Sequence, residues 1–280
     1  MIDLAFSLGL AMATLVIAVS YAGRVSRVGA ARESRIERAG SSPLLGKAAM
    51  EMGYWAMRPV AQVCIALGLS ANVVSWISLG LAGLAGVSLA AGAFGLAAVI
   101  SLASSACDAL DGMIARDTGT ASDAGEVLDA AVDRYSELFF FGGIVLHERL
   151  DPFAIALTLA ATAGAIMVSY STAKAEALGV AAPRGAMRRQ ERAVYLVVGV
   201  ALVPVVASAC ARAGLPAWIA RAPLFAVLAL VAVVGNVSAV RRLKAIAEAV
   251  RKPRPARAKM SNEANAMTRD PHAAAGDAVR

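Results

Sequence analysis

The chain has 280 residues, of which 59% are hydrophobic and 17% are charged. Soluble domains are ordinarily about 45–50% apolar and about 25% charged, so this composition weighs against a soluble protein, even an Ala-rich helical one. The net charge of +7 does not require a nucleic-acid partner, because an excess of Lys and Arg in a membrane protein reports topology. The composition predicts an all-α, polytopic membrane protein that does not bind nucleic acid.

Seven apolar segments approach the length of about 20 residues that a membrane span requires. The first, residues 4–23, follows Asp3 and precedes a basic segment. This order favours an uncleaved anchor with its N-terminus outside, because a signal peptide carries its positive charge before the apolar core. Ser7 and Gly9 are small enough to pack against another helix. The later spans are expected at residues 72–92, 95–115, 124–147, 152–173, 191–211 and 222–242.

Between the first two spans, residues 43–69 mix apolar side chains with charged ones and contain the aromatic pair Tyr54 and Trp55. This pattern favours an amphipathic helix in the membrane interface, with the rings at headgroup depth, although a plain linker remains an alternative. The predicted regions are an extra N-terminal anchor, a basic cytoplasmic linker with the interfacial helix, a six-span catalytic domain, and a basic, disordered cytoplasmic tail, at residues 1–23, 24–70, 71–243 and 244–280.

The distribution of basic residues tests this topology. With the N-terminus outside, all but three of the 27 Lys and Arg residues fall on the cytoplasmic side, and the exceptions are Arg149, Arg212 and Arg221. Such a bias is expected of a membrane protein, so the chain is predicted to be integral to the cell membrane. The same map places the loop between the spans at 95–115 and 124–147 at the cytoplasmic face.

That loop and the two helix ends beside it contain six aspartates between residues 108 and 133. A carboxylate inside a membrane helix costs about 2.5–3.5 kcal/mol on insertion scales, and such residues are by default functional. Four of the six have helical spacing and are expected to meet across two antiparallel helices: Asp108, Asp111, Asp129 and Asp133. The other two, Asp117 and Asp123, are expected in the loop.

The four helical aspartates predict a metal site. Carboxylates in such close proximity repel and cannot all ionise unaided, and divalent cations resolve this repulsion. The three Cys and two His residues have no metal-site spacing, and oxygen ligands alone favour Mg²⁺, Mn²⁺ or Ca²⁺. Two metal ions bridged by shared aspartates form a clamp suited to phosphoryl transfer. A carboxylate pair alone would equally suit the ion pathway or proton relay of a transporter.

The full spacing is D-x2-D-G-x2-A-R-x8-G-x3-D-x3-D, from Asp108 to Asp133. It resembles the signature of the CDP-alcohol phosphotransferase (CDP-alcohol phosphatidyltransferase) family, and the resemblance covers residues 55–243. The resemblance implies a six-span membrane enzyme that transfers a substituted phosphoryl group from a CDP-linked donor to an alcohol and releases CMP. The cofactor expected is a pair of Mg²⁺ ions, with Mn²⁺ as an alternative, and family members are often homodimers.

The resemblance also implies roles for individual residues. Asp108, Asp111 and Asp129 would bind metal, and Asp133 would bind the second metal and act as the general base for the acceptor hydroxyl. The residues that would hold the CDP part of the donor are Gly112, Arg116 and Ser122, together with Asn72, Val73, Val74 and Ser75, which resemble a donor-contacting segment of the family. Ala71 stands where that segment usually has proline.

Three further segments, at residues 133–143, 169–179 and 189–192, resemble phosphatidylinositol phosphate synthases. The basic residues that would bind the phosphate of a phosphorylated acceptor are Lys174, Arg189, Arg192 and Arg242. Positive-inside topology alone would also place them there. Thr172 replaces a basic residue of the family, so the expected acceptor is inositol phosphate, a related polyol phosphate or an unphosphorylated alcohol.

Three hypotheses for the activity remain open. The favoured one is transfer of a phosphatidyl group from CDP-diacylglycerol, whose acyl chains stay among the membrane lipids, to such an acceptor. The second is a CDP-choline or CDP-ethanolamine phosphotransferase acting on diacylglycerol. The third is an ion-coupled transporter, for which the buried carboxylates would provide the ion pathway.

Overall fold

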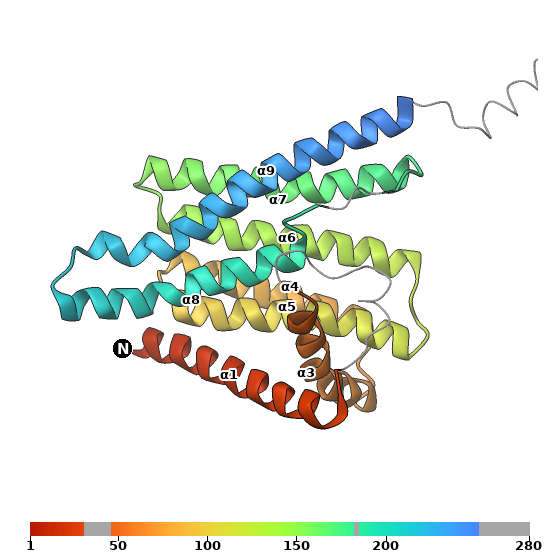
Figure 1. Cartoon of the computed structure of the whole chain (residues 1–280), viewed down its shortest axis with the longest axis horizontal. Helices are drawn as coiled ribbons and strands as arrows, with labels where there is room; N and C mark the ends of the chain where they lie inside the picture. The colour runs from red at the N-terminus through yellow and green to blue at the C-terminus, as the bar shows by residue number, and fades with distance from the viewer. Residues whose placement is uncertain (31–45, 182–184, 252–280) are drawn as a thin grey trace, which may run out of the picture.

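The computed structural model describes residues 1–30, 46–181 and 185–251, and within them the predicted all-α class is confirmed, with no strand. The elements are α1 (Ile2–Val28), α3 (Gly46–Ala66), α4 (Ala71–Ala90), α5 (Phe94–Asp117), α6 (Asp123–His147), α7 (Pro152–Ala177), α8 (Arg189–Ala213), the 3₁₀ helix η1 (Ala217–Arg221) and α9 (Ala222–Arg251). Figure 1 shows α4–α9 side by side along the long axis of the molecule.

Local sequence signals explain several helix boundaries. Ser122 caps α6 by accepting a hydrogen bond from the Gly125 amide at 3.2 Å. Asp151 caps α7 in the same way, and the proline that follows it suits a first helical position. Gly214 ends α8 in the left-handed conformation, with φ 66°, which glycine adopts without steric cost. These short caps keep the connections between helices tight.

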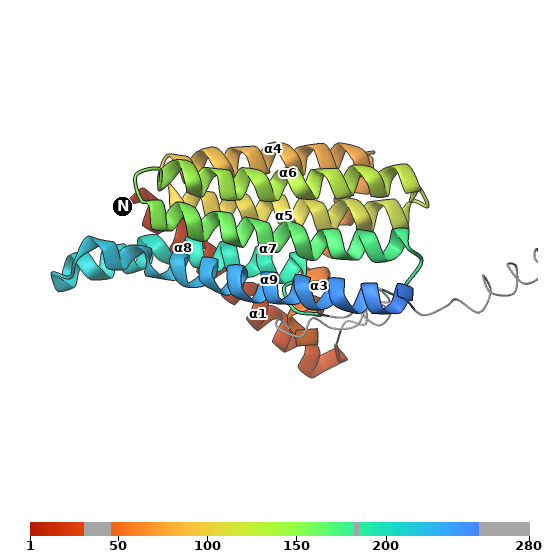
Figure 2. The same cartoon turned by 90° about the horizontal axis from the view of Figure 1, so that it is seen from above.

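The helices alternate in direction, so their connections gather at two ends of the bundle. Residues 118–122 and the C-terminal end of α7 lie at one end, and the connections after α4, α6 and α8 lie at the other (Figures 1 and 2). Among the described residues, six segments are long and apolar enough to cross a membrane: α1, α4, α5, α7, α8 and η1 with α9. This arrangement agrees with an integral membrane protein.

Helix α6 was also expected to be a span, at residues 124–147, and it is not among those six segments. Its length is sufficient, at 25 residues, but Asp129, Asp133, Arg134 and Glu137 make its first half polar. It packs against α4 and α7 within the bundle, as Figure 2 shows. The first half of α6 is thus too polar for a typical span, and two of its acidic residues, Asp133 and Glu137, pair with arginines of α8.

Glycines let the backbones of α4 and α6 approach closely. A Cβ atom added to Gly143 of α6 would lie 2.3 Å from the carbonyl oxygen of Gly86 in α4. A Cβ added to Gly86 would lie 2.5 Å from the carbonyl oxygen of Phe139. Because both obstacles are backbone atoms, neither could rotate away from a larger side chain. The distance between α4 and α6 therefore depends on these two glycines.

Helix α1 packs against the bundle near its N-terminus. The Asp3 carboxylate accepts a hydrogen bond at 3.0 Å from the Leu96 amide in the first turn of α5. Ser7 is buried where a Cβ on Gly95 would lie 2.8 Å from its hydroxyl oxygen. The expectation that Ser7 packs against another helix is thus confirmed. A Cβ atom added to Gly9, in contrast, would meet nothing within 4 Å.

Near its C-terminus, α1 contacts α3. The Tyr21 hydroxyl lies 3.4 Å from Glu51 Oε2, and the Tyr21 ring centroid lies 5.5 Å from that of Trp55. Figure 1 shows α3 at a steep angle to the bundle helices, as expected of an interfacial helix. Tyr54 departs from the expectation, because it is buried in an apolar cluster with Leu110 of α5 instead of lying at headgroup depth.

The predicted boundaries of the terminal regions change at two places. Helix α1 extends to Val28, beyond the expected end of the anchor at residue 23. Helix α9 extends to Arg251, so residues 244–251, which were expected in a disordered tail, are helical. Residues 31–45 of the expected linker and 252–280 of the expected tail lie outside the described residues.

The glycine contact between α4 and α6 yields a prediction. We expect Gly143→Ala to destabilise the protein by about 1–3 kcal/mol, the usual cost of overpacking. Gly142→Ala is the matched control, because a Cβ there meets nothing within 4 Å, and alanine is favoured over glycine in a helix by about 1 kcal/mol. Thermal unfolding in detergent measures both variants. Equal midpoints for the two would contradict the close backbone contact.

Candidate metal and catalytic centre

Three of the four predicted aspartates meet where α5 and α6 face each other. Asp108 and Asp111 lie on α5, and Asp129 lies on α6. Each offers a carboxylate oxygen, and these oxygens all lie within 4.8 Å of one another. The three carboxylates share one small volume, as a metal site requires.

Helix α4 fixes one member of this group. Asp111 is 5% exposed, and its Oδ2 accepts a hydrogen bond at 2.5 Å from the Ser75 hydroxyl. Ser75 is itself buried and also lies 3.2 Å from the carbonyl oxygen of Ala71. Ser75, which is predicted to contact the donor, thus also holds the Asp111 carboxylate in place.

The fourth aspartate, Asp133, joins the group through an arginine. Arg189 Nη1, at the start of α8, lies 2.5 Å from Asp108 Oδ2 and 2.6 Å from Asp133 Oδ1. A second cation, Arg134, lies 3.6 Å from Asp133 Oδ2 and is more exposed. Arg189 was predicted to bind the acceptor phosphate, and here it bridges two aspartates on different helices. The four carboxylates are therefore neighbours, but they do not form one symmetric cluster.

The donor set fits a hard divalent cation. Asp108 Oδ1 is a buried oxygen without a hydrogen-bond partner, whereas Asp133 Oδ1 lies 2.6 Å from Arg189 Nη1. A buried carboxylate oxygen that lacks a partner is costly, and a metal ion is one partner that would offset this cost. Because every candidate ligand is an oxygen, Mg²⁺ or Mn²⁺ is chemically suited to the position.

The predicted donor-binding residues occupy two neighbouring places. Asn72 and Val73 are exposed in the first turn of α4, whereas Val74 is buried in an apolar cluster. Arg116 folds back over the preceding turn of α5, since a Cβ on Gly112 would lie 3.1 Å from its Nη1.

Ser122, the remaining predicted donor contact, is exposed, but its hydroxyl oxygen already caps α6. Ser122 and Arg116 flank the short loop that joins the two aspartate-bearing helices.

The other basic residues predicted to bind the acceptor phosphate differ in exposure. Lys174 is exposed on α7. Arg192 is only 1% exposed and donates to Glu137 Oε1 and to the Met187 carbonyl oxygen, at 2.7 Å for the latter. These contacts direct the Arg192 guanidinium into the protein.

Arg242, on α9, is 6% exposed and donates to the Thr172 hydroxyl at 3.2 Å and to the Gly185 carbonyl oxygen at 3.1 Å. Its Nε is buried without a hydrogen-bond partner. Thr172, which replaces a basic residue of the family, thus accepts a hydrogen bond from Arg242. The predicted basic cluster is divided, with Arg189 at the aspartates and Arg242 near Thr172.

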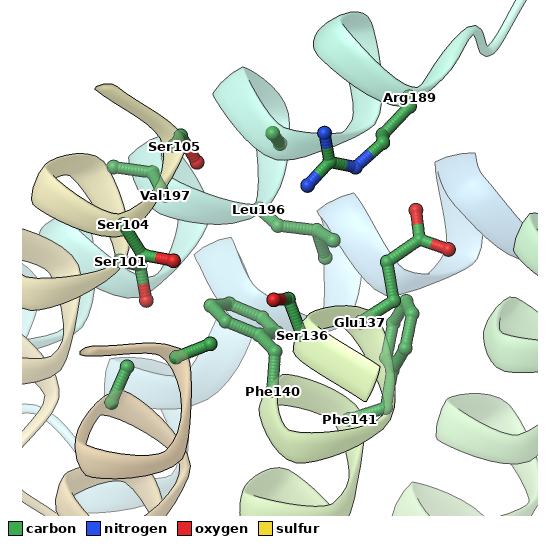
Figure 3. A pocket seen from close by; sticks show the side chains of 13 residues that line it. Ser101, Ser104, Ser105, Ser136, Glu137, Phe140, Phe141, Arg189, Leu196 and Val197 are labelled. Carbon is green, nitrogen blue, oxygen red and sulfur yellow. The ribbon is translucent and has the colours of Figure 1, made fainter. Parts of the chain in front are cut away.

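Sequence reasoning overlooked Glu137 as a site residue. It follows Asp133 by four residues and continues the stripe of Gly125, Asp129 and Asp133, so the spacing could have identified it. Its carboxylate lines a cavity of about 60 Å³ beside Arg189. Figure 3 shows serine hydroxyls from α5 and α6 around this space: Ser101, Ser104, Ser105 and Ser136.

Comparison with known proteins gives a consistent result. Residues 68–238 match the CDP-alcohol phosphatidyltransferase family. The phosphatidylinositol phosphate synthase of Corynebacterium glutamicum is 32% identical over 151 residues, which cover 52% of this chain and 69% of that protein. That of Cutibacterium acnes is 29% identical over 202 residues, which cover 70% of this chain and 95% of that protein.

Solved structures show the same similarity. Phosphatidylinositol phosphate synthase of Mycobacterium tuberculosis, crystallised with CDP-DAG bound, superposes with a TM-score of 0.58 at 25% identity, over 68% of this chain and 92% of that one. A second structure of that protein, in complex with manganese and citrate, gives the same TM-score over 68% of this chain and 88% of that one. In these comparisons α1 lies outside the family match.

The aspartate cluster predicts stabilisation by divalent cations. A ligand that binds only the folded state stabilises it by about 2.7 kcal/mol at 100 times its Kd, so we expect Mn²⁺ to raise the unfolding midpoint in detergent. Asp129→Asn should remove most of this shift, because it removes one carboxylate of the cluster. Asp123→Asn, in the first turn of α6 but outside the cluster, should retain it. Equal shifts in the two variants would refute metal binding at the cluster.

Proposed function

The chain belongs to the CDP-alcohol phosphatidyltransferase family, and on this premise we propose that it transfers the phosphatidyl group of CDP-diacylglycerol to an alcohol and releases CMP. Family membership makes it a membrane-bound transferase of phospholipid synthesis, which replaces the transporter hypothesis. The observation that carries the proposal is the meeting of Asp108, Asp111 and Asp129 within 4.8 Å, on two helices that bear the family's signature.

We propose that these aspartates hold two Mg²⁺ ions, with Asp133 among the ligands of the second and with Mn²⁺ as a substitute. The manganese complex of the mycobacterial synthase supports divalent-metal chemistry in a related protein. Bound divalent cations supply Lewis-acid polarisation of the pyrophosphate and stabilise the negative charge on departing CMP. Ser75 contributes by fixing the orientation of Asp111.

Asp133 is proposed to be the general base. The acceptor hydroxyl oxygen forms a bond to the phosphorus of the phosphatidyl group, the bond from that phosphorus to the oxygen of CMP breaks, and the hydroxyl proton passes to Asp133. A base need only be within hydrogen-bond reach of that proton. The Asp133 side chain is 14% exposed beside Asp108, so it borders the metal ligands while remaining accessible to an acceptor.

Donor binding is assigned to the surface next to the aspartates. Arg116 supplies a positive charge for phosphate oxygens, and Gly112 leaves space in front of it. Asn72 and Val73 expose the beginning of α4 to the cytidine part, with Ser122 across the loop. Of the remaining predicted contacts, Val74 supports this helix end by packing, and Ser75 acts through Asp111.

The positive-inside bias supports an active site at the cytoplasmic face, because the aspartates lie at the end of the bundle next to residues 118–122. The acyl chains of the donor would remain in the surrounding lipid. The four predicted regions of the chain, with their boundaries moved to the observed helix ends, remain our proposal for its organisation. A homodimer is proposed from the family resemblance alone.

For the acceptor we propose a polyol phosphate, with inositol phosphate as the first choice. The similarity to phosphatidylinositol phosphate synthases supports this choice. Arg189 supplies positive charge at the aspartates, Lys174 and Arg242 supply it on α7 and α9, and Arg192 supports α8 from within. Since Thr172 contacts Arg242, this hydroxyl helps to define the shape of the acceptor site.

The proposed role of Asp133 as the general base yields a testable prediction. Asp133→Asn should lower the rate of CMP release at least 10²-fold, the lower end of what general-base catalysis contributes. Asn keeps the shape of the side chain, so the variant should still fold, although it loses the ion pair with Arg189. Asp123→Asn is the control and should retain activity. A turnover of Asp133→Asn near that of the control would remove Asp133 from the mechanism.

The substrates are tested by measuring Mg²⁺-dependent CMP release and by identifying the lipid product with mass spectrometry. We expect release with CDP-diacylglycerol and none with CDP-choline plus diacylglycerol. Among inositol phosphate, glycerol phosphate, inositol and serine, inositol phosphate should be the best acceptor. A product formed only with serine would refute the proposed acceptor class, and release with CDP-choline would refute the donor.

A further inference from the structure

Arg189 occupies an unusual place for a residue beside a metal site. Its Nη1 atom lies 2.5 Å from Asp108 Oδ2 and 2.6 Å from Asp133 Oδ1, so one nitrogen contacts carboxylates of two helices. The three side chains are between 14% and 24% exposed, and their attraction is therefore less screened than that of a surface pair. Arg189 supplies the positive charge that these two carboxylates need.

A divalent cation cannot share these oxygens with the guanidinium. Mg²⁺ holds its ligands at about 2.0–2.1 Å, and a positive group already within hydrogen-bond distance of the same oxygens would be repelled by it. Arginine remains charged at every physiological pH, so it cannot relieve the repulsion by losing a proton. A cation that takes Asp108 Oδ2 and Asp133 Oδ1 as its ligands must therefore displace Arg189.

The cavity beside Arg189 provides a second position for the guanidinium. Glu137 Oε1 is paired with Arg192, but Glu137 Oε2 is buried without a hydrogen-bond partner. The hydroxyls of Ser101 and Ser136 line the same cavity and also lack partners. Figure 3 shows the Arg189 guanidinium and the Glu137 carboxylate directed into this space from opposite helices. Five guanidinium donors match such a set of free acceptors.

We propose that Arg189 is a built-in competitor for the metal site with two positions. In one position it pairs with Asp108 and Asp133. When a divalent cation takes Asp108 Oδ2 and Asp133 Oδ1 as ligands, Arg189 leaves these oxygens and pairs with Glu137 Oε2 in the polar cavity. This inference rests on the proposed metal-binding role of the aspartates. It also explains why Glu137 Oε2 is buried without a hydrogen-bond partner when Arg189 is at the aspartates.

The proposal predicts a metal affinity that is limited by Arg189. Free Mn²⁺ measured by electron paramagnetic resonance gives the Kd of the full-length protein in detergent without reference to turnover. Arg189→Gln removes the competitor, so its Kd for Mn²⁺ should fall roughly tenfold, equivalent to about 1.4 kcal/mol. Its unfolding midpoint without metal should fall as well, because Asp108 and Asp133 lose their partner.

Glu137→Gln tests the second position. The amide still accepts a hydrogen bond from Arg192 but attracts Arg189 less, so the Kd for Mn²⁺ should rise. In the Arg189→Gln background the same substitution should have no effect on the Kd, since no guanidinium remains to be moved. This non-additivity separates coupling through Arg189 from a direct effect of Glu137 on the metal.

Arg221→Gln is the matched control. Arg221 Nη1 lies 2.6 Å from Glu148 Oε2 at the other end of the bundle, so its loss removes a comparable ion pair far from the aspartates. It should lower the unfolding midpoint and leave the Kd for Mn²⁺ unchanged. Arg189→Lys retains a competing charge, and its Kd should lie closer to that of the parent protein than the Kd of Arg189→Gln does.

An unchanged or higher Kd in Arg189→Gln would overturn the competitor role. If that variant does not fold, an unchanged Kd in Glu137→Gln would overturn the second position. These results differ from failure of the proposed function itself, in which the parent protein would bind no Mn²⁺ at a site sensitive to Asp129→Asn. That outcome would remove both the metal site and the competition for it.

Discussion

The structure depends on the charge balance of carboxylates placed inside an apolar helical bundle. Asp108, Asp111 and Asp133 are largely or wholly withdrawn from solvent, and a buried carboxylate without a partner is unstable. Each partner comes from another helix: Ser75 from α4 and Arg189 from α8. The requirement to neutralise these carboxylates therefore joins four helices at one end of the molecule, and the same requirement makes that end a suitable place for divalent cations.

Close backbone contact keeps this arrangement in register. Gly86 and Gly143 allow α4 and α6 to touch along their backbones, which holds Ser75 and the α6 aspartates at a fixed separation. On the other side of α5, the Asp3 carboxylate caps the first turn of the helix that carries Asp108 and Asp111. Helix α1, which lies outside the family match, thus directly supports the helix that carries these two aspartates.

One basic residue at the opposite end of the bundle is also balanced by buried or half-buried carboxylates from other elements. Arg221 is one of three that depart from the positive-inside bias, and its Nη1 lies 2.6 Å from Glu148 Oε2 and 3.6 Å from Asp151 Oδ2. Its charge is thus balanced locally, and the guanidinium also lies 5.4 Å from the centre of the Phe225 ring.

The sequence by itself determined the helical class, the order of the helices and the aspartates that would meet, because periodicity and span length are local properties. It did not determine that Arg189 pairs with Asp108 and Asp133, that Arg192 is buried on Glu137, or that Ser75 holds Asp111. Those partners lie between 36 and 81 residues apart. Only the packing of α4, α5, α6 and α8 brings them together, because the pairing of a buried charge depends on which helix faces it and not on its neighbours along the chain.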